Sequence, residues 1–101
     1  MVKGTMLPLE RDGVRITCLT QGVIDLLSTL SVGAWARLCK RIERCQAAAT
    51  SNTGAECVFT THAYDYDYEM RVRVHPDKTV LIMAESDARR FEADPRMAAS
   101  R

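Results

Sequence analysis

The chain has 101 residues, a net charge of +1 and an apolar fraction of 47%. This length fits one domain, and the composition excludes wholesale disorder. A net charge so close to zero does not by itself indicate a nucleic-acid or membrane partner, so any such site must come from local clustering of charges.

The first half of the chain predicts one strand followed by two helices. Residues 1–11 have no clear periodicity, and we expect a loose N-terminal or edge segment there. After a turn signal at Asp12-Gly13 the residues alternate, which predicts a strand over 14–19. The period then becomes helical, first over 21–30 and next over 32–49. Thr20 and Ser31 stand where N-caps are expected. The apolar stripe of the second helix is Trp35, Leu38, Cys39, Ile42, Gln46 and Ala49.

The second half predicts three strands and a short helix. The strands are expected at 56–63, 64–74 and 79–85, and a type I turn signal at 75–78 joins the last two in a hairpin. Ser86 can cap a short helix that ends before Asp94-Pro95. Residues 95–101 are expected to be a frayed tail.

The element order is therefore β-α-α-β-β-β-α within a single domain, residues 1–101. Segregated helices and strands predict an α+β fold: a small antiparallel sheet of three to four strands with two main helices on one face. We expect strand 14–19 or strand 56–63 to be the sheet edge. Because an edge must be paired, covered or charged, a homodimer is expected.

The segment 64–74 alternates without a break and predicts two different faces. Tyrosines and aliphatic residues fall on one side, where Tyr68 and the residues after it are expected to pack under the helices. Charged residues fall on the other side, and the next strand is apolar on both sides, so Arg71 and Arg73 must share a face with apolar residues. A partner is one way to cover that face. The predicted partner-binding residues are Tyr64, Asp65, Tyr66, Asp67, Arg71 and Arg73.

A second candidate surface is the basic face of helix 32–49, which carries Arg37, Lys40, Arg41 and Arg44. It is either an ordinary solvated face or a contact for nucleic acid or an acidic partner. No aromatic residue interleaves with these cations to stack bases. The two helices could also form a helix-turn-helix, with Arg37 and Lys40 facing DNA.

The four cysteines form no C-x-x-C pair, and the chain does not open on a basic-then-apolar leader. These features favour reduced thiols in a cytoplasmic protein, and no membrane span, metal site or cofactor is expected.

No short catalytic or nucleotide-binding motif is present, so we do not expect an enzyme. Catalysis would require a deep pocket with His62 at its wall. The sequence instead favours a small non-catalytic protein-interaction domain that regulates or inhibits a larger protein or complex. A bacterial or phage protein, such as an inhibitor of host defence, fits this description. The alternative is a nucleic-acid-binding regulator that uses the basic helix face.

Overall fold

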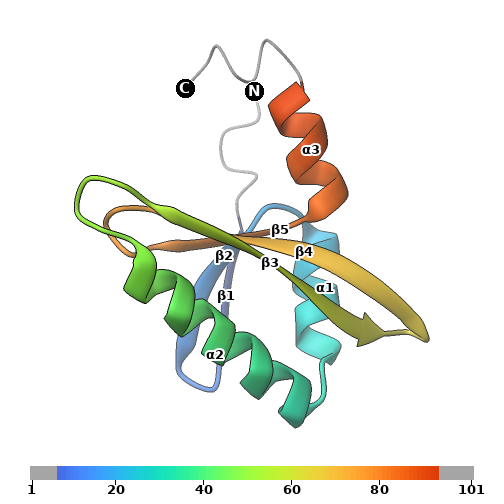
Figure 1. Cartoon of the computed structure of the whole chain (residues 1–101). Helices are drawn as coiled ribbons and strands as arrows, with labels where there is room; N and C mark the ends of the chain where they lie inside the picture. Colours follow the sequence, from blue (N-terminus) through green and yellow to red (C-terminus); the bar gives the residue numbers. More distant parts are fainter. Residues whose placement is uncertain (1–6, 94–101) are drawn as a thin grey trace.

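The computed structural model describes residues 7–93, with side chains to Arg90. Within these residues it is an α+β fold with a five-stranded mixed sheet and three helices (Figure 1). The elements are β1 (Leu7–Arg11), β2 (Val14–Cys18), α1 (Gln21–Thr29), α2 (Val32–Ala48), β3 (Ala55–Ala63), β4 (Tyr66–Val74), β5 (Val80–Ala84) and α3 (Glu85–Ala93). The strand order is β1-β2-β5-β4-β3, so β1 and β3 are the two edges.

The predicted sheet had too few strands, and its parallel pairing was not predicted. Part of the segment that was expected to be loose forms β1, which pairs antiparallel with β2 from Leu7 opposite Cys18 to Arg11 opposite Val14. β2 also pairs with β5 in parallel, so the sheet is mixed. Of the two strands predicted as edges, only β3 is one. Residues 1–6 and the predicted tail 95–101 lie outside the described part of the chain.

Both main helices lie on one face of the sheet, as predicted (Figure 1). α1 packs against β1, β2 and β5, whereas α2 packs against β3 and β4. The predicted caps are confirmed, because Thr20 Oγ1 accepts from the Val23 N–H at 3.3 Å and Ser31 Oγ accepts from the Ala34 N–H at 3.1 Å. α3, in contrast, begins at Glu85, directly after β5, so Ser86 is not its cap.

The core lies between these two helices and the inner face of the sheet. Its buried members come from all of these layers and include Cys18, Leu27, Trp35, Leu38, Ile42, Val72 and Ile82. Arg11 fastens β1 to the helices. Its guanidinium donates to the carbonyl oxygens of Leu27 and Leu30, each at 2.8 Å, and lies 5.0 Å from the centre of the Trp35 ring. This cation–π contact adds to the two charge-assisted hydrogen bonds at the end of α1.

The C-terminal end of α2 is held by the turn between β4 and β5. Lys78 Nζ donates to the carbonyl oxygens of Gln46 at 2.7 Å and Ala49 at 2.6 Å. Gln46 Nε2 in turn donates to the Lys78 carbonyl at 3.1 Å. A cation at a helix C-terminus is favourable because the last carbonyls carry partial negative charge. The contact fixes the position of α2 along the sheet.

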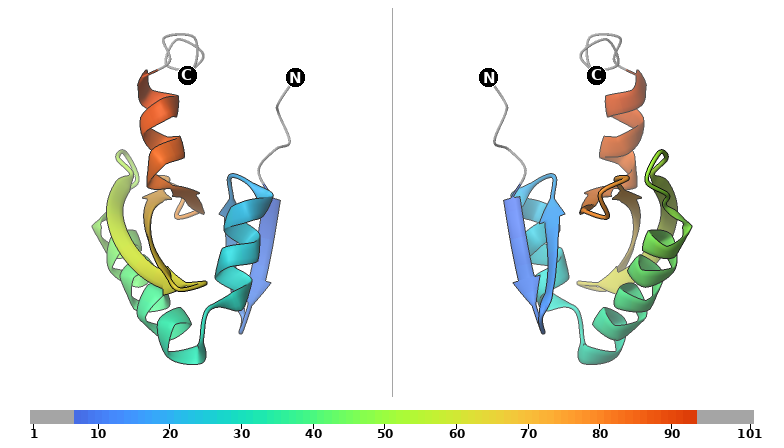
Figure 2. Two further views of the ribbon diagram at one scale, coloured as in Figure 1. Left: turned by 90° about the vertical axis from the view of Figure 1, so that its right-hand side faces the viewer. Right: turned by 90° about the vertical axis from the view of Figure 1, so that its left-hand side faces the viewer.

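α3 covers part of the opposite face of the sheet (Figures 1 and 2). Arg71 stands opposite Met83 and Arg73 opposite Leu81, which confirms that these arginines share a face with apolar residues. Leu81 and Met83 are nevertheless buried, because Ala88 of α3 and Leu19 pack against them. A partner chain is therefore not needed to cover them.

The positive charges of the two arginines on this face are neutralised by carboxylates of the same chain. Arg71 makes a two-pronged contact with Glu85, at 2.9 Å from Nε and 2.7 Å from Nη2, and a further ion pair with Glu56 at 3.0 Å. Arg73 also pairs with Glu56. The mismatch that suggested a partner from the sequence is thus resolved inside the monomer.

Because two cysteine thiols are buried, we expect the folded protein to lose stability in alkaline solution. Burial raises the pKa of Cys18 from its ordinary value of 9.0 to about 11. Burial and a hydrogen bond with Cys57 raise the pKa of Cys45 to about 11 as well. Between pH 9 and pH 11 the thiols are ionised in the unfolded chain and protonated in the folded one. Their contribution to the free energy of unfolding is therefore fully present below pH 9 and is lost as the pH rises through 11.

We expect each thiol to contribute on the order of 1 kcal/mol to this loss. Guanidinium unfolding at several pH values, under reducing conditions, measures it. Cys18→Ala will show a shallower fall than the wild-type protein, and an identical slope in both proteins would contradict the assignment.

Candidate functional site

The β3–β4 hairpin projects beyond the helices and ends in a tight turn (Figure 1). Ala63 pairs with Tyr66, and the two residues between them have positive φ, 54° at Tyr64 and 66° at Asp65. Two successive positive φ values are those of a type I′ turn. The alternation predicted for 64–74 therefore begins only at Tyr66.

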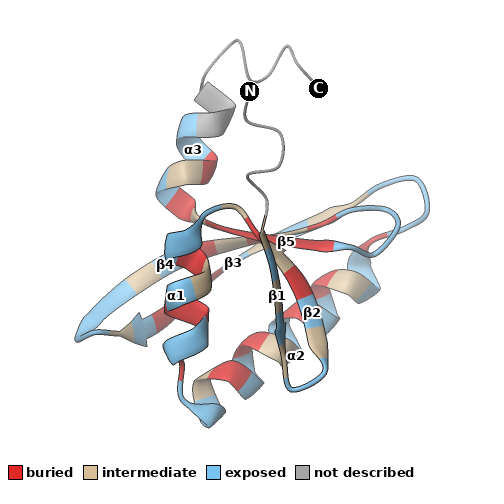
Figure 3. Cartoon of the chain, turned by 180° about the vertical axis from the view of Figure 1, so that it is seen from behind, coloured by how far each residue is buried: buried red, intermediate tan, exposed pale blue. Residues whose placement is uncertain are grey.

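The tyrosines at the hairpin tip are exposed. Tyr64 is 56% exposed and Tyr66 is 68% exposed, whereas Tyr68 is half-buried against the core. Figure 3 displays the exposed tip in pale blue.

The six residues predicted to bind a partner do not form one surface. Tyr64 and Asp65 lie in the turn, and Tyr66 points to the helix-covered side of the sheet. Asp67 lies on the opposite side, as do Arg71 and Arg73, which are held in the ion pairs with Glu56 and Glu85. These contacts leave the two arginine side chains only 16% and 23% exposed.

The basic face of α2 is more accessible. Its four cations, Arg37, Lys40, Arg41 and Arg44, are all exposed. None of them forms an ion pair with a residue whose side chain the structure describes. The four divide into two pairs: Arg37 and Arg41 border a groove, whereas Lys40 and Arg44 do not.

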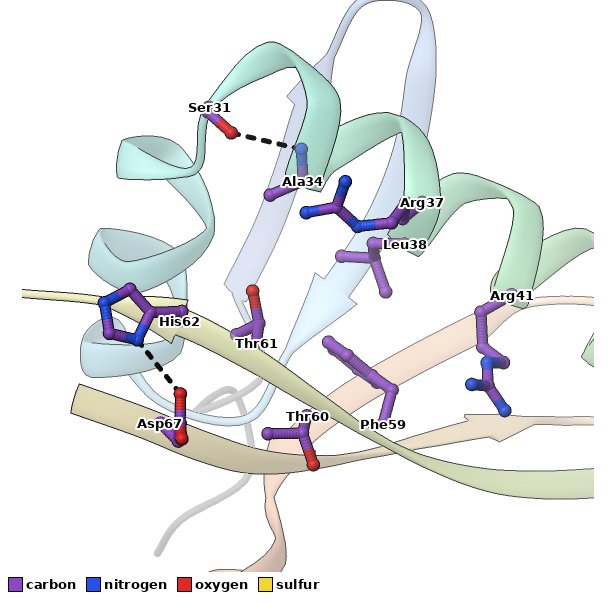
Figure 4. A pocket seen from close by; sticks show the side chains of 10 residues that line it. All are labelled: Ser31, Ala34, Arg37, Leu38, Arg41, Phe59, Thr60, Thr61, His62 and Asp67. Carbon is purple, nitrogen blue, oxygen red and sulfur yellow. Dashed lines mark hydrogen bonds and ion pairs between the residues drawn. The ribbon is translucent and has the colours of Figure 1, made fainter. Parts of the chain in front are cut away.

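The groove has a volume of about 470 Å³ and lies between α2 and β3 (Figure 4). Its helix wall consists of Ala34, Arg37, Leu38 and Arg41, and its strand wall of Phe59, Thr60, Thr61 and His62. Leu38 and Phe59 are buried and make the base apolar. The groove therefore combines an apolar base with two cations on one wall.

The strand wall is also a sheet edge. The two-residue turn makes Ala63 and Tyr66 a hydrogen-bonded pair, and in an antiparallel ladder such pairs alternate. The backbone groups of Phe59 and Thr61 are therefore directed to β4, and those of Val58, Thr60 and His62 are directed outward. No strand within residues 7–93 pairs with this outer side of β3.

His62 and Asp67 stand at one end of the groove. His62 Nδ1 lies 2.9 Å from Asp67 Oδ1, across the two strands. Their side chains are 66% and 75% exposed. His62 thus borders an open groove. Among the described residues, no group of three or more His, Cys, Asp or Glu side chains could hold a metal ion.

The helices do not form a helix-turn-helix unit. In such a unit the first helix packs across the recognition helix. Here α1 and α2 instead pack on different strands of one sheet.

No helix in the described part of the chain has the length and apolarity needed to cross a membrane. The four cysteines, all within it, are free thiols. No protein-family model matches the chain, and no curated protein or solved structure matches it either.

Proposed function

We propose that this chain is a non-catalytic protein-interaction domain that binds an acidic segment of a larger protein, and by binding regulates or inhibits it. The groove between α2 and β3 is the observation that carries the proposal. It offers an apolar base, two exposed cations, Arg37 and Arg41, and outward-directed backbone groups along one strand. These are the features by which proteins capture extended segments of other proteins.

Affinity capture from the native host tests this proposal. The informative variant is Arg37→Glu/Arg41→Glu, which reverses both groove cations. Lys40→Glu/Arg44→Glu is a matched control because it has the same spacing, the same helix and the same change in net charge. All four residues are exposed, so both variants should fold.

We expect a polypeptide to be captured by the wild-type protein and by the Lys40/Arg44 control, and to be lost with the Arg37/Arg41 variant. Equal capture by all three proteins would contradict binding at the groove. Circular dichroism of each variant checks that the fold is intact.

Nucleic-acid binding is the second candidate, and the exposure of all four cations on α2 favours it. Phosphate contacts predict that binding to a labelled oligonucleotide falls steeply as salt rises from about 50 to 200 mM. In that case both charge-reversal variants lose affinity, because each removes two cations from the same face. Fluorescence anisotropy therefore separates the two candidates.

A homodimer is a further proposal, because β1 and β3 both present an edge. Pro8 in β1 lacks a backbone donor, which weakens pairing at that edge. Light scattering at increasing protein concentration measures the oligomeric state.

A further inference from the structure

The outer edge of β3 and the basic wall of α2 fit one kind of ligand in particular. We infer that an extended acidic segment adds to the sheet as a strand beside β3, with carboxylates at alternate positions facing Arg37 and Arg41. This inference rests on the proposed function and specifies the conformation and the chemistry of the bound segment.

The spacing of the two arginines supports this conformation. They stand four residues apart on α2, which corresponds to about 6 Å along the helix axis. Alternate side chains of a strand point to the same face and are about 6.6 Å apart. α2 runs alongside β3 in Figure 1, so acidic residues at positions i and i+2 of an added strand match the arginine spacing.

The strand wall of the groove supports the addition of a strand independently. Val58, Thr60 and His62 direct their backbone groups outward at every second residue, which is the pattern that a new strand needs. Leu38 and Phe59 close the base of the groove beneath it. An added strand would thus gain main-chain hydrogen bonds along one side, and the methylene groups of its acidic side chains would contact the apolar base.

A second copy of this chain is a poorer occupant. Pairing of β3 with β3 of another copy would bring the two α2 helices side by side. Arg37 and Arg41 of each copy would then approach those of the other, and like charges in such a position repel. An acidic segment has the complementary charge.

The test uses the whole ¹⁵N-labelled protein and an end-capped peptide of about eight residues in which glutamate alternates with valine. Hydrogen exchange of single amides is followed by NMR. We expect the peptide to slow exchange at Val58, Thr60 and His62 by about tenfold or more, and to leave Phe59 and Thr61 unchanged because they already bond to β4.

Two comparison peptides sharpen the result. One has the same composition but adjacent glutamates, and we expect it to bind about tenfold more weakly. The other carries N-methyl groups on alternate backbone nitrogens and is made in two versions, one methylated at the odd positions and one at the even positions. Methylation of one parity should abolish binding and that of the other should leave it, because only one set of peptide nitrogens faces β3.

The possible failures are distinct. Binding that depends on Arg37 and Arg41 but does not protect Val58, Thr60 and His62 would overturn strand addition and leave the proposed function standing. Absence of saturable binding at about 1 mM peptide would overturn strand addition by acidic segments. If an oligonucleotide then shifts the α2 amides and both charge-reversal variants abolish that shift, the proposed function fails as well.

Discussion

Replacing Gly54 by alanine will lower the midpoint of thermal unfolding by about 10–15 °C. Gly54 lies where the loop after α2 enters β3, and a Cβ atom there would overlap the backbone carbonyl of Val74. A backbone oxygen cannot move aside without disturbing the pairing of Ala55 with Val74 at the start of the β3–β4 ladder. The substitution therefore forces apart two strands of the sheet.

Gly22→Ala is the matched control for this experiment. A Cβ atom at Gly22 would lie at ordinary contact distance, 3.7 Å from Thr20 Oγ1. Because alanine is the better helix former, we expect this variant to gain about 0.5–1 kcal/mol. Differential scanning calorimetry of both variants measures the difference, and equal melting temperatures would show that the close approach at Gly54 is tolerated.

Replacing Arg71 by alanine will lower the melting midpoint by about 10 °C. Arg71 neutralises Glu85, whose side chain is only 8% exposed, and also contacts Glu56. Without it, among the described side chains, Glu56 keeps only Arg73, and the buried Glu85 keeps only the exposed Arg89, so the loss of its two-pronged partner is strongly unfavourable. Arg89→Ala is the control, because Arg89 contacts the same Glu85 but is 73% exposed, and such pairs contribute little.

The pH dependence of this effect follows from Glu85. Hydrogen bonding from the Arg71 side chain lowers the pKa of Glu85 below its ordinary value of 4.5. The resulting stability is present above pH 4.5 and is lost as the pH falls through the lowered pKa. The difference between wild type and Arg71→Ala should therefore shrink in acid, and a difference that stays constant down to pH 2 would contradict the pairing.

Local patterns were sufficient to predict most elements of this fold. The change from alternation to helical spacing located α1 and α2, and Thr20 and Ser31 signalled their starts because capping depends on residues three positions apart. The apolar stripe of α2 was predicted except for Cys45, which is buried but was not predicted to belong to it.

Long-range pairing could not be predicted in the same way. β1 has no periodic signal of its own, and its residues become a strand because β2 supplies hydrogen-bond partners. The parallel pairing of β2 with β5 joins segments more than sixty residues apart, at Thr17 and Leu81, and nothing local indicates it. Tyr64-Asp65 lacks the glycine or asparagine that usually indicates a type I′ turn, so the strand was predicted to continue through it.

The candidate site was only partly foreseen for the same reason. The cations of α2 were predicted as a surface from helical spacing alone. Their position beside the open edge of β3 depends on the strand order, which places β3 at the end of the sheet. Arg71 and Arg73 were assigned to a partner because their actual partners, Glu56 and Glu85, lie 15 and 14 residues away from Arg71 in the chain.

Site-specific photo-crosslinking in the native host tests the central claim most directly. A photoreactive residue replaces Thr60 on the outer edge of β3 in one protein, and Glu10 on the opposite edge strand in another. Both positions are exposed. Binding at the groove predicts a protein adduct from position 60, through an acidic segment of a partner, and none from position 10. Equal adducts from both positions, an adduct with nucleic acid, or an adduct only with a second copy of this chain would contradict it.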